Sequence, residues 1–151
     1  MKFAALAFYM TISIPVMAQQ KTATTVAETA KITFTTTLAK RGSGDWTKEL
    51  VRALIDSPLV VKDEKGKSYP IVRFTLNYTF SSVYVDGQTK QKKVRKDFRS
   101  QTFESSLISE VWRNSIKDNA RNGDVMVFND VIIRMPDGKK RLVDDITINI
   151  K

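Results

Sequence analysis

The sequence contains neither cysteine nor histidine among its 151 residues. Without cysteine, the chain has no disulfide, no thiolate zinc site and no cysteine for lipid attachment. Without histidine, it lacks the commonest general base, the commonest metal ligand and every Ser-His or Cys-His dyad. An enzyme built on this chain would depend on carboxylates, lysine, tyrosine or a Ser-Lys pair. These absences narrow the catalytic options sharply.

Acidic residues are scarce relative to basic ones: the sequence has 16 Asp and Glu residues and 25 Lys and Arg residues, and the formal net charge is +9. A strongly basic protein is attracted to anionic lipid head groups, acidic polymers and acidic protein surfaces. The chain length is that of one domain with a single core. Charge and length therefore indicate what the protein associates with, but they do not indicate a reaction.

The first residues have the pattern of an export signal. Lys2 precedes an apolar run from Phe3 to Val16, and Val-Met-Ala ends this run at Ala18. This order is typical of a secretory signal peptide, and the run is short for a membrane span. We predict a signal peptide over residues 1–18, cleavage after Ala18 and a periplasmic product. Residues 19–30 are predicted to form a flexible lead-in and residues 31–151 a single folded domain.

The stretch Tyr69–Val85 organises the predicted domain, because apolar and polar residues alternate along it as in a half-buried β-strand. A straight strand of this length would span roughly 50–55 Å. A domain of this size has a radius of gyration of about 14 Å. We therefore predict that the strand bends or breaks at Ser81-Ser82.

Asp86-Gly87 predicts a turn, with Gln88–Phe98 as the return strand. A two-residue loop would place Val94 opposite Thr79 and Phe98 opposite Thr75. A three-residue loop would place Val94 opposite Phe80 and Phe98 opposite Leu76. Pairing of apolar side chains favours the three-residue loop.

Two helices are predicted. Apolar spacing over Trp46–Ile55 indicates a short helix, with Asp45 as a candidate N-cap. Phe103–Ala120 predicts the longer helix, with Thr102 as its cap and Asn122-Gly123 after its end. Two apolar ridges on this helix are predicted to pack on a sheet: Phe103, Leu107 and Val111, and beside them Ile108, Trp112, Ile116 and Ala120.

The predicted C-terminal part is β-structure: Val125–Phe128, Val131–Arg134, a Pro136-Asp137-Gly138 turn, Arg141–Val143 and Ile146–Ile150. With the preceding elements this gives an α+β fold. It is a mainly antiparallel, β-sandwich-like domain with one long and one short helix.

This C-terminal series resembles the C-terminal periplasmic domain of GldM (PorM), the gliding-motility and type IX secretion component. Gly123, a short apolar strand, Pro-Asp-Gly, Arg141 and an alternating apolar strand follow each other in the same order. The resemblance covers about residues 32–151, with the distinctive pattern in the last thirty or so. It implies a fold and an extracytoplasmic assembly role through protein contacts. Family members carry an N-terminal membrane helix and several periplasmic domains, whereas a cleavable signal and one domain are predicted here.

The predicted return strand is unusually basic, and its basic residues are the candidate binding residues: Lys90, Lys92, Lys93, Arg95, Lys96 and Arg99. They could form an anion-binding ridge for an anionic envelope polymer or lipid. They could instead protect an edge strand against pairing with other chains. Only Val94 and Phe98 are interleaved with them, so the aromatic platforms of nucleic-acid binders are lacking.

Four late carboxylates could form an acid–base pair or a calcium site: Asp130, Asp137, Asp144 and Asp145. Asp137 belongs to a turn, adjacent Asp144 and Asp145 would point to opposite faces, and no D-x-D-x-D-G spacing occurs. We therefore predict a non-enzymatic protein without cofactor or metal. Its expected partner is an envelope protein or a second copy of itself, with no nucleic acid and no membrane span after signal cleavage.

Overall fold

The computed structural model describes residues 32–151, and the predicted signal peptide and lead-in lie outside this range. Within it, nine strands and two helices form an α+β fold of mainly antiparallel strands, which confirms the predicted fold class. No helix in residues 32–151 has the length and apolar content that crossing a bilayer requires.

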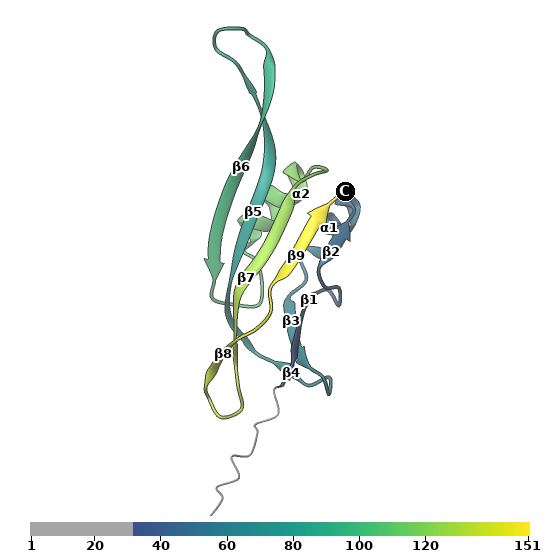
Figure 1. The fold of residues 1–151 in the computed structure, drawn as a ribbon, viewed down its shortest axis with the longest axis vertical. Helices are drawn as coiled ribbons and strands as arrows, with labels where there is room; N and C mark the ends of the chain where they lie inside the picture. Colours follow the sequence, from purple (N-terminus) through teal and green to yellow (C-terminus); the bar gives the residue numbers. More distant parts are fainter. Residues whose placement is uncertain (1–31) are drawn as a thin grey trace, which may run out of the picture. The chain divides into compact units, whose positions relative to one another are not determined.

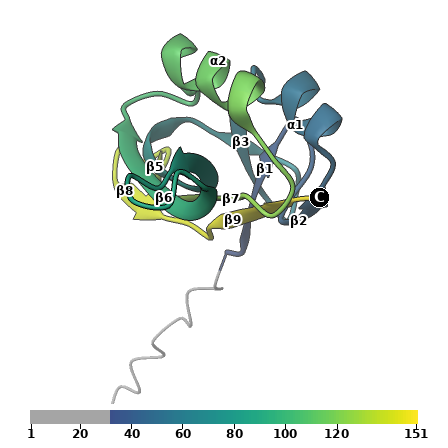
Figure 2. The same ribbon diagram turned by 90° about the horizontal axis from the view of Figure 1, so that it is seen from above.

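The strands form two sheets. In the smaller sheet β3 (Leu59–Asp63) lies between β1 (Phe34–Leu38) and β4 (Ser68–Tyr69). In the larger sheet the order is β2 (Gly44–Trp46), β9 (Ile146–Ile150), β7 (Val125–Arg134), β5 (Ile71–Val85) and β6 (Lys92–Phe103), with β8 (Lys140–Leu142) paired to β7. Only β2 and β9 pair in parallel among the described strands. Both helices lie on the same side of the larger sheet (Figure 2).

The core forms on the helix-covered side of the larger sheet, as the alternating pattern predicts. Phe74, Leu76 and Tyr78 of β5 are buried, whereas Arg73 is exposed. The Phe74 ring stacks on Phe103 with centroids 5.2 Å apart. Burial of these large apolar side chains is the main stabilising term of the fold.

Helix α1 (Lys48–Leu54) begins later than predicted. Trp46 belongs to β2, and Thr47 is the N-cap instead of Asp45. The Thr47 hydroxyl accepts a hydrogen bond from the Leu50 N–H at 3.3 Å. A Thr at this position satisfies one of the free N–H groups of the first turn.

Helix α2 (Glu110–Asn119) is shorter than the predicted Phe103–Ala120 helix. Phe103 ends β6, and Ser109, not Thr102, is the N-cap. Of the two predicted ridges, the one containing Ile108 and Ile116 is buried, whereas in the other only Phe103 is buried and Leu107 is 41% exposed. Val111 is 78% exposed. The i,i+4 spacing of Phe103, Leu107 and Val111 was therefore coincidental, because these residues lie in a strand, a loop and a helix.

Strand β5 runs unbroken through Ser81-Ser82, so the predicted bend there is wrong. Its pairing irregularity lies near the opposite end, between Ile71 and Thr75 on the β7 side. The strand does not need to bend at Ser81 because its last third leaves the core, as described below.

Strand β7 replaces the two predicted segments Val125–Phe128 and Val131–Arg134. Asp130, with φ 51°, lies between them where the β5–β7 register shifts. Such a bulge changes the alternation, so Phe128 and Val131 both face the core. The predicted Pro136-Asp137-Gly138 turn is confirmed: the Gly138 N–H donates to the Met135 carbonyl at 2.9 Å.

Candidate functional site: a β-hairpin that extends past the core

The hairpin formed by β5 and β6 continues beyond the rest of the larger sheet (Figure 1). Strand β5 pairs with β7 only as far as the pair Thr79–Val125. It continues to pair with β6 as far as Val85–Lys92. Residues 80–97 therefore form a two-stranded ribbon that no other described strand flanks.

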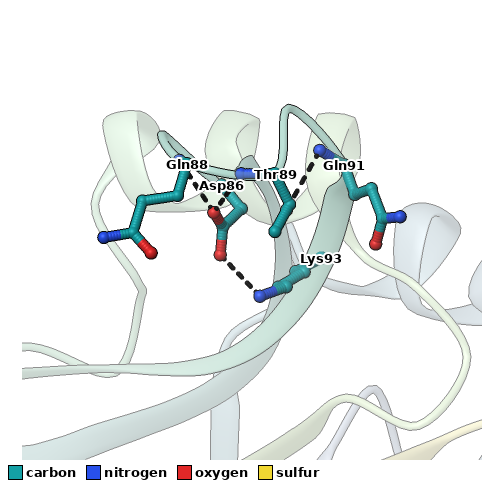
Figure 3. Close-up of polar contacts among 5 residues, drawn as sticks. All are labelled: Asp86, Gln88, Thr89, Gln91 and Lys93. Carbon is teal, nitrogen blue, oxygen red and sulfur yellow. Dashed lines mark hydrogen bonds and ion pairs between the residues drawn. The ribbon is translucent and has the colours of Figure 1, made fainter.

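The tip of this ribbon is organised by Asp86 (Figure 3). Its carboxylate accepts hydrogen bonds from the Gln88 and Thr89 N–H groups at 3.0 and 2.9 Å, and it pairs with the Lys93 ammonium. These donors, Lys93 first, lower the pKa of Asp86 to about 2. An Asp that accepts local N–H groups stabilises a loop that lacks regular backbone pairing.

The predicted register of this hairpin is wrong in both of its alternatives. Six residues, 86–91, separate the paired ends, and Val94 lies opposite Val83, with Phe98 opposite Thr79. The prediction assumed that Val94 and Phe98 must reach the core. In the structure they lie on the other face of the strand and are 68% and 63% exposed.

The six predicted basic residues do not form one patch. Lys93, Arg95 and Arg99 lie on the core-facing side of β6, Lys92 and Lys96 lie on the opposite side, and Lys90 is in the tip loop. The alternation of a strand predicts Lys90, Lys92 and Lys96 on the side of Val94 and Phe98, and Lys93, Arg95 and Arg99 on the other. The structure agrees for all of these except Lys90, which precedes the strand.

Several of these charges have partners within the hairpin or beside it. Lys93 pairs with Asp86, and the Arg95 Nε lies 3.0 Å from a carboxylate oxygen of Asp97. The Lys96 ammonium donates to the Gly123 carbonyl at 2.8 Å. The positive potential of the hairpin is therefore lower than its sequence indicates.

Sequence reasoning missed a set of exposed apolar side chains on the outer face of the hairpin. We call it the outer stripe; its members are Val83, Val85, Val94 and Phe98. They share one face because Val83 pairs with Val94, and the others lie at steps of two or four residues along the strands. The i,i+4 spacing of Val94 and Phe98 indicates that the two side chains share one face of the strand. The sequence prediction placed that face against the core, whereas it is exposed.

The structure brings Asp130, Asp144 and Asp145 near one another, whereas Asp137 is held within its turn. The Asp137 carboxylate accepts a hydrogen bond from the Lys139 N–H at 3.1 Å within its turn. Burial, with Asp130 and Asp144 nearby, raises the pKa of Asp145. Among residues 32–151, no three His, Cys, Asp or Glu side chains are placed to hold a metal ion.

No family model and no curated protein matches this chain. The site is therefore interpreted from its own geometry.

Proposed function

We propose that this chain is a non-enzymatic structural or adaptor module of the cell envelope that acts through protein–protein contacts made by the β5–β6 hairpin. Its C-terminal pattern resembles the terminal domain of GldM, which favours a role in a secretion or motility type of assembly. The signal-like N-terminus favours action in the periplasm. The absence of cysteine and histidine from the sequence favours a non-enzymatic role.

The outer stripe is the observation that carries the proposal. Val83, Val85 and Val94 lie together on a projecting ribbon, with Val83 49% and Val85 58% exposed, and the exposed Phe98 lies on the same face beyond the Ser81–Lys96 pair. Clustered exposed apolar side chains are typical of surfaces that bind a partner. On the same face, Lys92 pairs with Val85 and Lys96 lies between Val94 and Phe98, so charged groups border the apolar side chains.

A second candidate function is binding of an anionic envelope polymer or lipid by the same hairpin. Six basic residues within Lys90–Arg99 favour it. The division of these residues between two faces and the pairing of Lys93 and Arg95 with carboxylates disfavour it. We therefore rank the protein-contact function first.

The test is a triple variant, Val83→Ser, Val94→Ser and Phe98→Ser, used to capture partners from native envelopes with mass-spectrometric identification. Because all three side chains are exposed, the free energy of unfolding should change by less than about 1 kcal/mol. We expect the variant to lose captured proteins that the wild-type chain and a Leu142→Ser control retain; Leu142 is 62% exposed on β8.

A variant with Lys90→Gln and Lys92→Gln separates the two functions. If the triple variant still captures its partners while this variant loses an envelope polymer or lipid at low salt, the protein-contact function is wrong. The anion-binding function then takes its place.

A further inference from the structure

A groove lies between helix α2 and the core-facing side of the hairpin, and of the outer stripe only Val83 lines it. It consists of a cavity of about 270 Å³ and an adjoining one of about 150 Å³. Both are lined by Tyr78, Arg99 and Ser115; the first adds Phe80, Ser81, Ser82, Val83, Asn119 and Arg121, and the second adds Val111, Trp112 and Ile116. We call this the α2 groove.

Two arginines give the groove its charge. Arg99 reaches it from β6, and Arg121 reaches it from the segment after α2. The Arg99 guanidinium lies 5.1 Å from the centroid of the Phe80 ring, a stacked position that leaves its N–H groups free to donate. Among the described residues, neither guanidinium donates a side-chain hydrogen bond or forms an ion pair.

The nearest buried carboxylate does not neutralise these arginines by direct pairing. Asp124 is completely buried. It accepts hydrogen bonds from the Tyr78 hydroxyl at 2.9 Å, the Ser81 N–H at 2.9 Å and the Arg121 N–H at 2.8 Å. Three donors occupy its oxygens, so the donors of both guanidiniums remain for a ligand.

The other part of the groove is apolar. Val111 is 78% exposed, beside the half-buried ring of Trp112, which packs edge-on against Phe103. Both residues lie on the first turn of α2, whereas Ser115 and Asn119 continue the groove along the helix. The groove thus presents an apolar surface next to two cationic groups.

We propose that the α2 groove binds an acidic peptide segment whose carboxylates pair with Arg99 and Arg121 and whose neighbouring apolar side chain contacts Val111 and Trp112. This inference rests on the proposed function in one respect, because it takes the ligand to be a segment of a partner protein. Guanidinium groups bind carboxylates by paired hydrogen bonds. No Asp or Glu side chain lines either cavity, and the buried Asp124 beneath Tyr78 and Ser81 already accepts three hydrogen bonds.

A second basic hollow supplies a matched control. It is lined by Pro70, Ile71, Val72, Arg73, Glu104, Arg134 and Lys140. It also contains two arginines, but Glu104 brings a negative charge into it. Substituting Arg73 and Arg134 removes the same net charge as substituting Arg99 and Arg121.

The experiment uses the two tryptophans of the chain as reporters. The NMR signal of the Trp112 indole N–H reports on the groove, and that of Trp46, which is buried in β2, is an internal reference. The probe is a short acetylated peptide of two glutamates followed by leucine, with a glutamine version as the control peptide. Inorganic phosphate and phosphatidylglycerol vesicles are tested in parallel.

We expect the glutamate peptide, and not the glutamine peptide, to shift the Trp112 signal while leaving Trp46 unmoved. Arg99→Gln with Arg121→Gln should weaken binding about tenfold or more, as loss of paired charged contacts does. Arg73→Gln with Arg134→Gln should leave it unchanged.

The proposal is overturned if both peptides bind equally, if both double variants lose binding equally, or if only phosphate or vesicles bind. The double variant Val94→Ser with Phe98→Ser, which leaves the groove-lining Val83 unchanged, should keep peptide binding. If it does so but still captures every envelope partner, the proposed function fails while the groove assignment stands.

Discussion

At the scale of single residues, Asp124 connects three parts of the chain. Its carboxylate joins the side chain of Tyr78 in β5, the backbone of Ser81 and the backbone of Arg121. A buried carboxylate requires such donors, because transfer of an unsatisfied charge from water is costly. The same interactions fix the floor of the α2 groove.

The first prediction concerns this network. Tyr78→Phe removes one donor to a buried charge and should destabilise the protein by about 1.5–3 kcal/mol, as measured by chemical denaturation. Thr79→Val, on the other face of β5, is the control and should change stability by less than about 0.5 kcal/mol. An equal loss in both variants would show that the Tyr78–Asp124 hydrogen bond contributes nothing specific.

The second prediction concerns Asp86 at the hairpin tip. Its pKa, about 2, should be measurable by NMR titration of the carboxyl carbon. Because the pKa is lowered, the stabilisation of the tip is present above the unfolded-state pKa of about 3.9 and is lost as the pH falls through 2. Lys93→Gln should raise the pKa of Asp86 towards its ordinary value; an unchanged pKa would mean that the backbone donors alone hold it.

At the scale of secondary structure, the sequence predicted where strands and helices exist better than where they end. The last strand, Ile146–Ile150, was predicted with its correct bounds, since alternation and the preceding Asp144-Asp145 define it. The start of α2 could not be predicted in this way. Leu107 and Val111 continue the helical spacing of Phe103, and only the tertiary structure shows that they are exposed.

Helix α2 gives the third prediction. Ile116→Ala should cost about 2–5 kcal/mol, because Ile116 is completely buried against the sheet. Trp112→Ala should cost less than the 3–5 kcal/mol typical of a fully buried ring, about 2 kcal/mol, since Trp112 is only half-buried. Val111→Ala is the surface control, at less than about 0.5 kcal/mol. A Trp112→Ala loss equal to that of Ile116→Ala would contradict the exposed groove.

The hairpin shows why part of the candidate site could not be predicted from the sequence. A straight strand over Tyr69–Val85 is too long for a domain of this size, and a bend is one way to accommodate its length. The structure uses the other way, in which the strand leaves the core. Both solutions satisfy the same alternation, so the pattern could not separate them, and Val94 and Phe98 were assigned to the wrong face.

The fourth prediction tests the independence of the hairpin. Joining Ser81 to Lys96, which are paired, through an Asn-Gly turn removes residues 82–95. No residue in that segment is fully buried, so the free energy of unfolding should change by less than about 1 kcal/mol. Partner capture should be lost. A variant that fails to fold would show that the ribbon stabilises the core.

At the scale of the whole molecule, the positive charge and the exposed apolar side chains of the hairpin have opposite effects on self-association. Among the strands of residues 32–151, β6 is an edge strand with one side of its backbone unpaired, and the outer stripe adds apolar surface to it. Both features favour association between copies. The basic residues of the hairpin oppose it, because two copies that meet there bring like charges together.

The fifth prediction follows from this balance. Raising the salt concentration from 0.1 to 1 M shortens the Debye length from about 10 to about 3 Å and should promote self-association in analytical ultracentrifugation. Lys92→Gln with Lys96→Gln should promote it already at 0.1 M, and the outer-stripe triple variant should suppress it at both concentrations. Unchanged monomer in 1 M salt would show that charge repulsion is not what keeps the copies apart.

The unbroken course of β5 also determines how the molecule would bear a mechanical load. The same strand forms one side of the ribbon and, between Ile71 and Thr79, pairs with β7 inside the larger sheet. A pull on the tip along the strand direction loads these β5–β7 hydrogen bonds together in shear. A sideways push instead bends a ribbon of two strands, which is weak by itself. The hairpin would therefore transmit tension to the sheet and yield to lateral displacement, as a tether does.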